Sequence, residues 1–556
     1  MAQLSVRSSR RCRRARPERH LRSGVPARRQ LGRAVSPRGQ PADARRLDHP
    51  LRHGSGGAKA RPGGGEREGR GPRAARALER DRTRALRPLP RVRRVAALSP
   101  ELAQPRGRFR TVAREKLADA HVEGAIDVAT ERLSAARTRA WDELPDIEAL
   151  REQARDIRMR TIQDLDHHLA DFTRAVEDLG GHVHFCRTAD DARARAVEIC
   201  RSVDAKLVAK SKSMASEEIG LNEALAEAGV EAVETDLGEY ILQLAGEHPV
   251  HIVAPAIEKT GTDVARIFSQ AQGREIPAEL TALTQAAREQ LREVFLRADV
   301  GVTGVNFGVA RTGSICICTN EGNGRLVSAL PRVHIAIMGM ERVVPTLAEL
   351  AVLLQLLGRS GTGQKLTAYT TLLTGPRRDG ERDGPEDLHV IVLDNGRSNL
   401  LGTRYEEMLS CIRCGACLNV CPVFRKTGGA AYGPVYSGPM GAVLAPLLVG
   451  IENAPTLPHA SSLCGACTAA CPVKIPLHEY LLDLRRDLVS EGVAPLRERL
   501  AFTLWSWAWS RPWGYRLSTA IGRLGAPVGG LVGPGRAWAA GRTLPPLAGR
   551  RYRDRA

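Results

Sequence analysis

The chain has 556 residues, enough for two to four domains, and its hydrophobic fraction of 43% is ordinary for a globular protein. Its net charge of +20 resembles that of a nucleic-acid-binding protein, but the charge is confined to one end. Residues 1–107 hold 28 Arg and one Lys against eight acids, a net of +21, so residues 108–556 carry only −1. We therefore expect no nucleic-acid partner for the main body. No run of 18 apolar residues occurs, so no membrane-spanning helix is expected.

The first segment, residues 1–107, is mostly Arg, Pro, Gly and Ala and shows no sustained hydrophobic periodicity. It would bury too little apolar surface to offset the entropy of ordering, so we expect it to be disordered. Two interpretations stay open: a basic arm for nucleic acid or membrane, or upstream sequence that is not truly part of the protein. The abrupt compositional break near Arg108 favours the second.

Four further regions follow along the chain. Residues 108–180 place apolar residues at helical spacing and are predicted to be helical. Residues 181–395 alternate short apolar runs with helical patterns, which indicates an α/β domain with a largely parallel sheet. Residues 396–490 carry two cysteine blocks, and residues 491–556 form a basic tail with five of the six tryptophans, suited to a membrane surface, a partner or the cluster domain. The predicted strands are HVHFC, KLVAK, EAVET, VHIVA, GVTGVNFGVA, GSICICTN, VHIAIMG and LHVIVLD.

Seven of the twelve cysteines lie in a stretch of about sixty residues, which points to metal binding in a reducing compartment rather than to a disulfide framework. The first block places Cys411, Cys414, Cys417 and Cys421 in the pattern C-x2-C-x2-C-x3-C-P. Three closely spaced thiolates wrap one corner of a cubane. In bacterial two-cluster ferredoxins the fourth Cys, which precedes Pro, binds the other cluster.

The second block has the same spacing, but Ser461 stands where the first Cys would be. Crossed ligation assigns four thiolates to the first cluster and three to the second. The fourth position of the second cluster stays open: it is a three-iron cluster, or a four-iron cluster with Ser461, water or another ligand. The first cluster takes Cys411, Cys414, Cys417 and Cys471, and the second takes Cys421, Cys464 and Cys467.

Structural zinc is the competing interpretation of these cysteines. Zinc sites need four ligands, commonly supplied as C-x2-C pairs, and seven cysteines in two blocks that each end in Cys-Pro match that pattern poorly. We therefore predict two iron–sulfur clusters, [4Fe-4S] for the first and [4Fe-4S] or [3Fe-4S] for the second.

Two polar segments follow predicted strands, where α/β sheets bind ligands. In the first, residues 210–218, two lysines and a helix start would hold an anion, with Ser216 as the helix cap, or would simply be a capped helix with solvated charges. Residues 319–325 are the second candidate. Cys316 and Cys318 share one face of a strand and are interpreted as core thiols, although one would be able to reach a cluster.

Five segments together carry a resemblance to a known family: KSKSMASEEIGLNEAL, ETDLGEYILQLAGEHPVHIVAPAI, GVTGVNFGVARTGSICICTNEGNGRL, CIRCGACLNVCPVF and SSLCGACTAACPVKIP. From about residue 108 to the tail the chain resembles the lactate-utilisation iron–sulfur subunit family (LutB/LldF type). The resemblance implies an α/β LUD domain similar to the NagB/RpiA/CoA-transferase fold, followed by an α-helical two-cluster ferredoxin domain. It also implies a role in oxidising L-lactate to pyruvate with companion subunits.

The sequence contains no dinucleotide fingerprint and no convincing flavin site, so no catalytic residue is assigned. We expect an electron-transfer subunit of an oxidoreductase that is not catalytic alone, with an unassigned electron acceptor. The alternatives are a subunit that serves another 2-hydroxy acid, glycolate or glycerol phosphate, or a ligand-binding protein whose clusters are structural or redox-sensing. We expect the protein in the cytoplasm, with at most peripheral contact at the inner face of the membrane.

Overall fold

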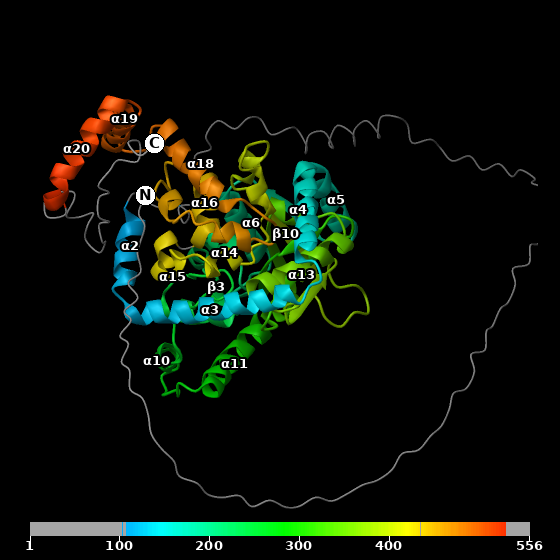
Figure 1. Cartoon of the computed structure of the whole chain (residues 1–556). Coiled ribbons are helices and arrows are strands. Elements are labelled where there is room, and N and C mark those ends of the chain that lie inside the picture. The colour runs from blue at the N-terminus through cyan, green and yellow to red at the C-terminus, as the bar shows by residue number, and fades with distance from the viewer. Residues whose placement is uncertain (1–102, 104–106, 434, 530–556) are drawn as a thin grey trace, which may run out of the picture. The chain divides into compact units, whose positions relative to one another are not determined.

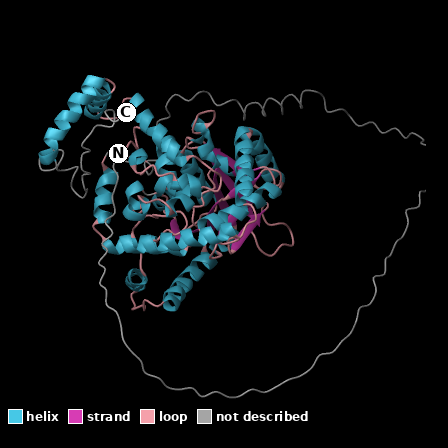
Figure 2. Ribbon diagram, viewed as in Figure 1, coloured by secondary structure: helices cyan, strands magenta, loops and turns pink. Residues whose placement is uncertain are grey.

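The computed structural model describes residue 103, residues 107–433 and residues 435–529, and all of these belong to one compact unit (Figure 1). The predicted disordered segment, apart from residues 103 and 107, lies outside the described residues, as does the end of the tail from residue 530. Figure 2 shows the strands enclosed by helices. Among the described residues, no helix combines the length and apolar character needed to cross a membrane.

The region before the first strand is helical, as its apolar spacing predicts. Asp119 caps the second of its four helices by accepting hydrogen bonds from the N–H groups of His121 and Val122, and Asp146 caps the third through the N–H of Ala149. These caps explain why the helices begin where they do. The helices are α2 (Arg108–Leu117), α3 (Ala120–Asp142), α4 (Ile147–Gln163) and α5 (Leu165–Asp178).

A six-stranded sheet forms the centre of the α/β domain, in the order β1-β10-β7-β4-β2-β3, and every neighbouring pair is parallel. The predicted fold class, an α/β domain with a parallel sheet, is confirmed. All seven residues of β7 are buried, as expected for a parallel strand covered on both faces. The strands are β1 (His182–Cys186), β2 (Leu207–Lys210), β3 (Glu231–Glu234), β4 (Val300–Gly304), β7 (Val333–Gly339) and β10 (Asp387–Leu393).

Alternate residues of β7 face two separate cores. Ile335 packs with α6 (Ala189–Ser202) and α8 (Leu221–Glu227) on one face, whereas Ala336 packs with Phe172 of α5 on the other. Helices α9, α10 and α11 bury a further cluster of their own. The remaining helices of this part are α7 (Met214–Glu218), α9 (Leu237–Ala245), α10 (Gly261–Gln272), α11 (Leu280–Arg297) and α12 (Asn323–Ala329).

A second sheet of four strands has the order β8-β5-β6-β9, with β6 antiparallel to both of its neighbours. Its strands are β5 (Phe307–Val309), β6 (Ser314–Thr319), β8 (Val343–Val344) and β9 (Tyr369–Leu373). The prediction of GVTGVNFGVA as one strand is wrong, because the segment divides into β4 of the six-stranded sheet and β5 of this sheet. The sequence patterns predicted β6 but missed β8, which is only two residues long, and β9, which is mostly exposed and lacks a buried face. Helix α13 (Leu347–Gly361) follows β8 and contacts both it and β5.

A second strand prediction is wrong: the VHIVA segment, residues 250–254, is a loop. The reason lies in His251, whose Nδ1 accepts hydrogen bonds from the N–H groups of Val253 and Ala254, both at 3.0 Å. Its Nε2 lies 3.0 Å from Oδ1 of Asn419. Because the imidazole satisfies these backbone groups, the segment turns instead of pairing with a strand.

The described residues after β10 form helices joined by loops and turns, without a strand, and share one core with the N-terminal helices. Ile126 of α3 and Ala154 of α4 belong to the same buried cluster as the cysteine blocks. Helices α19 and α20 expose large apolar side chains, including Trp505 and Trp513. The helices are α14 (Ala416–Asn419), α15 (Phe424–Thr427), α16 (Gly438–Val449), α17 (Ala466–Ala470), α18 (Leu477–Ser490), α19 (Leu496–Trp509) and α20 (Pro512–Gly529). Short 3-10 turns are η2 (Met340–Arg342), η3 (Arg397–Leu400), η4 (Glu406–Ser410), η5 (Ala430–Tyr432) and η6 (Leu457–His459).

Candidate functional site

The two cysteine blocks adopt the same backbone conformation. Arg413 and Leu463, which each precede the second thiol position of their block, have φ values of 59° and 56°. Gly415 and Gly465, which follow that position, have φ values of 78° and 80°, a region that glycine occupies without strain. Each block then enters a short helix, α14 or α17. The repeat seen in the sequence is therefore a repeat of structure.

Ser461 occupies the place in its block that Cys411 occupies in the first. The N–H of Leu463 donates to Oγ of Ser461 at 3.0 Å, and the N–H of Arg413 donates to Sγ of Cys411 at 3.5 Å. Both side chains therefore accept a hydrogen bond from the residue two positions later. The same backbone contact therefore positions the serine oxygen and the first thiol of the other block.

Four of the predicted ligands line one small cavity: Cys411, Cys414 and Cys417 from the first block, and Cys471 from the second. Apolar side chains such as Val473 complete its wall. The chain thus brings together the four thiols that crossed ligation assigns to the first cluster, although Cys471 is far from the others in sequence.

The remaining three thiols form a second group. Burial raises the pKa of Cys467 to about 11, and the neighbouring Cys421 and Cys464 raise it further. Burial likewise raises the pKa of Cys421, with a smaller contribution from Cys464. Cys421 is buried and also hydrogen-bonds with the phenol of Tyr432, whereas Cys464 is exposed. The second group therefore reaches the protein surface.

Burial also governs the first group, because it raises the pKa of Cys414 and raises that of Cys471 to about 12. Thiols of this kind stay protonated at neutral pH unless a cation replaces the proton. Among the described residues, no group of three or more His, Cys, Asp or Glu side chains is arranged to hold a single metal ion. The thiols surround a cavity instead, as ligands of a larger group do.

Two buried arginines and one half-buried arginine lie around the first thiol group, and their charges show whether the site suits an iron–sulfur cluster. Arg151 donates through Nη2 to the carbonyl oxygen of Cys471 at 2.7 Å, and Arg342 donates through Nη1 to that of Cys411 at 2.7 Å. Arg137 interacts electrostatically with Cys414, yet its Nε and Nη1 are buried without a hydrogen-bond partner in the described structure. A cluster bound by four thiolates is an anion, so this cationic surrounding fits it.

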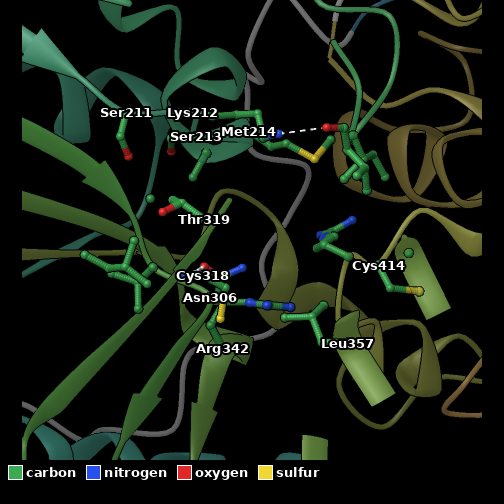
Figure 3. Close-up of a pocket in the computed structure, with 18 of the residues that line it drawn as sticks. Ser211, Lys212, Ser213, Met214, Asn306, Cys318, Thr319, Arg342, Leu357 and Cys414 are labelled. Carbon is green, nitrogen blue, oxygen red and sulfur yellow. Dashed lines mark hydrogen bonds between the residues drawn. The ribbon is translucent and has the colours of Figure 1, made fainter. Parts of the chain in front are cut away.

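A larger cavity of about 250 Å³ lies beside this site, at the carboxyl edge of the parallel sheet (Figure 3). Each of the strands β2, β3, β4, β7 and β10 is followed by a residue that lines it. These residues are Lys212, Asp236, Asn306, Arg342 and Arg397. Carboxyl edges of such sheets are where α/β proteins bind their ligands.

The two polar segments singled out in the sequence both contribute to this cavity. Lys212 lines it, donates to the carbonyl of Val253 at 3.1 Å and lies 3.5 Å from Asp236, and the segment 319–325 contributes its first three residues. Lys210 does not reach it: its side chain is fully buried in ion pairs with two glutamates. The expected cap is also wrong, because Ser213, not Ser216, caps α7; only Ser213 directly precedes the helix.

A fully buried ion-pair network closes the cavity on the side of the cysteine blocks. Glu218 accepts from Nη1 and Nη2 of Arg397 at 2.9 and 2.7 Å, and also from the amide of Asn395 and the hydroxyl of Tyr436. Nε of Arg397 lies 2.8 Å from Oε2 of Glu341. Burial opposes ionisation of Glu341, but the surrounding arginines outweigh it and hold its pKa at about 2. The network therefore stays charged at physiological pH.

Cys414 belongs to the walls of both cavities, so the first thiol group and the sheet-edge cavity are adjacent. Helix α13 approaches this point closely, since a Cβ built on Gly361 would lie 2.7 Å from the carbonyl oxygen of Cys414. Figure 3 shows Cys414 and Arg342 near Leu357, with Ser211, Lys212 and Ser213 across the cavity.

The other cysteines are placed as follows. Cys316 is buried in the core and its Sγ lies 3.8 Å from that of Cys318, which lines the sheet-edge cavity and not the thiol groups. Cys186 and Cys200 are buried, as core thiols would be. The interpretation as core thiols therefore suits Cys316, whereas Cys318 faces the cavity.

Comparison with known proteins agrees with this arrangement. A family model described as LUD domain matches residues 169–393, and one described as 4Fe-4S dicluster domain matches residues 407–475. Lactate utilization protein B of Bacillus thuringiensis (strain Al Hakam) is 47% identical over 444 residues, covering 78% of this chain and 94% of that protein, and lactate utilization protein B 2 of Bacillus mycoides (strain KBAB4) matches equally.

A solved structure of a DUF162 family protein from Deinococcus radiodurans is 15% identical, covers 41% of this chain and 98% of that one, and has a TM-score of 0.24, too low to carry an argument. The relatives and the two matched domains carry the assignment instead. The chain belongs to the lactate utilization protein B family, with an LUD domain followed by a 4Fe-4S dicluster domain.

Proposed function

We propose that this lactate-utilisation protein is the electron-transfer subunit of a complex that oxidises L-lactate to pyruvate. One observation carries the proposal: a single thiol, Cys414, lies in the walls of both the four-thiol cavity and the sheet-edge cavity. A ligand in the LUD domain would therefore lie next to the first cluster. Bound clusters would supply one-electron transfer, and two of them accept the two electrons of the reaction one at a time.

The proposed ligands follow the two thiol groups. Cys411, Cys414, Cys417 and Cys471 would hold a [4Fe-4S] cluster, and Cys421, Cys464 and Cys467 would hold a [4Fe-4S] or [3Fe-4S] cluster. The matched position of Ser461 and Cys411 favours a four-iron cluster with Ser461 at the fourth position. This chain's own residues bury three of the four thiols of the first site and leave the second open at Cys464.

The exposure of Cys464 suggests where electrons leave the subunit. We propose that companion subunits of the complex and the electron acceptor, whose identity is unassigned, dock on this side. Peripheral contact with the inner face of a membrane stays a prediction based on the exposed tryptophans of α19 and α20. Flotation with anionic vesicles tests it: protein that stays with the vesicle-free fraction would remove membrane contact from the proposal.

Low-temperature EPR on anaerobically purified protein, combined with a reductive titration and iron and sulfide assays, tests the proposal. We expect two cluster signals that are reduced during the titration and return when the protein is reoxidised. Clusters that are present but never change oxidation state would point to a structural role and overturn electron transfer. L-lactate dehydrogenase activity in the isolated chain would overturn the view that companion subunits are needed.

A further inference from the structure

The sheet-edge cavity has the size of a small-metabolite site. Its volume of about 250 Å³ lies below the roughly 300–1,000 Å³ of sites for drug-sized ligands. A dinucleotide or a coenzyme A moiety would exceed it. Backbone segments from five parallel strands meet here, so the wall is rigid and the polar groups on it are held in place.

Of the cations on the cavity wall, all but one form a close ion pair with a carboxylate. Arg397 and Arg413 share the buried carboxylates Glu218 and Glu341, and Lys212 is paired with Asp236. Arg342 is different. Within the described part of the chain it makes no close ion pair with a carboxylate, and Glu341 acts on its charge only at longer range.

The polar contacts of Arg342 are carbonyl oxygens. Nη1 donates to Cys411 at 2.7 Å, and the guanidinium stacks over the ring of Phe307 at 4.9 Å. Only 5% of Arg342 is exposed, so water does little to compensate its charge. A ligand carboxylate in the cavity would add to the compensation that Glu341 and a bound first cluster give at longer range, and guanidinium groups match carboxylates well.

The opposite wall limits the ligand to one negative charge. Asp236 caps α9, and Oε2 of Glu321 accepts from the N–H of Leu237 at 2.9 Å at the start of the same helix. A second anionic group on that side would face these two carboxylates. Ser211, Lys212 and Asn306 instead offer a hydroxyl, an ammonium and an amide, which suit a hydroxyl or keto oxygen (Figure 3).

We propose that the sheet-edge cavity binds a small monocarboxylate, a 2-hydroxy or 2-oxo acid, with its carboxylate on Arg342, and that this binding is coupled to the charge of the first cluster. The proposal rests on the proposed function, because it assumes a cluster on Cys411, Cys414, Cys417 and Cys471.

The coupling follows from the position of Arg342 between the two cavities. The same guanidinium contacts the carbonyl of a first-cluster residue and lines the ligand cavity. An electron added to the cluster adds negative charge beside the ligand, so the oxidised protein binds the carboxylate more tightly than the reduced protein. By linkage, the bound carboxylate makes the first cluster harder to reduce, by the same factor.

The test uses oxamate, an unreactive analogue of a 2-oxo acid, on the anaerobic full-length protein. Isothermal titration calorimetry measures its binding, and an EPR-monitored redox titration measures the first-cluster potential with and without it. Neutral lactamide is the control ligand. We expect oxamate to bind about tenfold more tightly to the oxidised protein and to lower the first-cluster potential correspondingly, with no effect of lactamide.

Two substitutions test whether oxamate binds in the sheet-edge cavity. Arg342→Lys keeps a charge but loses the planar fork, and Lys212→Met removes a donor from the opposite wall without touching the cysteine blocks. Each is expected to weaken oxamate binding at least tenfold. The matched control is Lys259→Met, since Lys259 is a half-buried lysine paired with Glu247 at 2.5 Å and lies outside the cavity wall.

The outcomes separate this inference from the proposed function. Reducible clusters whose potential ignores oxamate, or oxamate binding that survives Lys212→Met, would overturn the inference and leave electron transfer standing. Calorimetry alone decides binding even in a preparation without clusters. Absence of any reducible cluster signal would overturn the proposed function and the coupling together.

Discussion

Arg151 of α4 donates two hydrogen bonds to the carbonyl oxygen of Cys471, from Nη2 at 2.7 Å and from Nε at 3.2 Å. The two residues are 320 positions apart, and only 7% of Arg151 is exposed. A helix from the first described region thus holds the last thiol of the second cysteine block. The N-terminal helices therefore form part of the surroundings of the first thiol group.

Replacing this arginine should lower the reduction potential of the first cluster. Arg151→Gln removes a positive charge beside Cys471, so adding an electron to the cluster becomes less favourable. Two unit charges about 8 Å apart at an effective dielectric constant of about 20 interact by roughly 2 kcal/mol, and about 1.4 kcal/mol corresponds to about 59 mV for one electron. We expect the potential of one signal to fall by tens of millivolts in an EPR-monitored titration. The exposed Arg160 on the same helix gives the control, Arg160→Gln, and an equal shift there would contradict the assignment.

Crossed ligation predicts which signal each cysteine variant removes. Cys471→Ser should abolish the cluster that also uses Cys411, although its own block supplies the other cluster. Cys464→Ser should remove only the second signal. EPR with iron analysis distinguishes the cases. If Cys471→Ser and Cys464→Ser abolish the same signal, each block holds its own cluster.

Replacing the serine of the second block with cysteine should stabilise the second cluster. Ser461→Cys places a thiol where the hydrogen bond from Leu463 already holds an oxygen, matching Cys411 in the first block. Four thiolates should make the second cluster more resistant to loss of one iron. We expect slower decay of the [4Fe-4S] signal on exposure to air than in the native protein. Ser462→Cys, one position along, is the control, and equal protection by both would count against the predicted site.

The buried ion pair between Glu218 and Arg397 predicts a large loss of stability when it is broken. Glu218→Gln keeps the shape, but its amide nitrogen cannot accept the hydrogen bonds that a carboxylate oxygen accepts from Arg397 and Tyr436, and it leaves Glu341 as the carboxylate that still pairs with Arg397. Removing one member of a buried pair costs about 3–5 kcal/mol. Chemical denaturation measures the change in unfolding free energy. Glu386→Gln, in an exposed pair with Arg332, should leave stability almost unchanged.

A buried histidine predicts how stability depends on pH. Burial, with repulsion from His389, lowers the pKa of His334 on β7 from 6.5 to about 3. The unfolded chain therefore binds a proton below pH 6.5 that the folded chain does not. Stability is fully present above pH 6.5 and falls towards pH 3, by up to about 1.4 kcal/mol per pH unit. His334→Gln should reduce this slope in pH-dependent denaturation, and an unchanged slope would contradict the assignment.

The sequence alone determined the features that depend on residues close together in the chain. Thiol spacing, the Cys-Pro ends and the α/β alternation are local patterns, so the 4Fe-4S dicluster domain and most strands were predicted correctly, while the ligands of each cluster stay a prediction. The strand predictions that failed also relied on local patterns. The VHIVA segment has the composition of a strand, but His251 satisfies its backbone groups through contacts that no short window contains.

Only the tertiary structure decided the surroundings of the thiols. Arg151, Arg342 and Glu218 come from three distant segments, and nothing in their neighbouring residues distinguishes them from surface charges. The cavity exists because five strand ends converge at one sheet edge, and it adjoins the first thiol group because Cys414 lines both cavities. Charge compensation in a buried site is a property of three-dimensional packing, which sequence spacing does not encode.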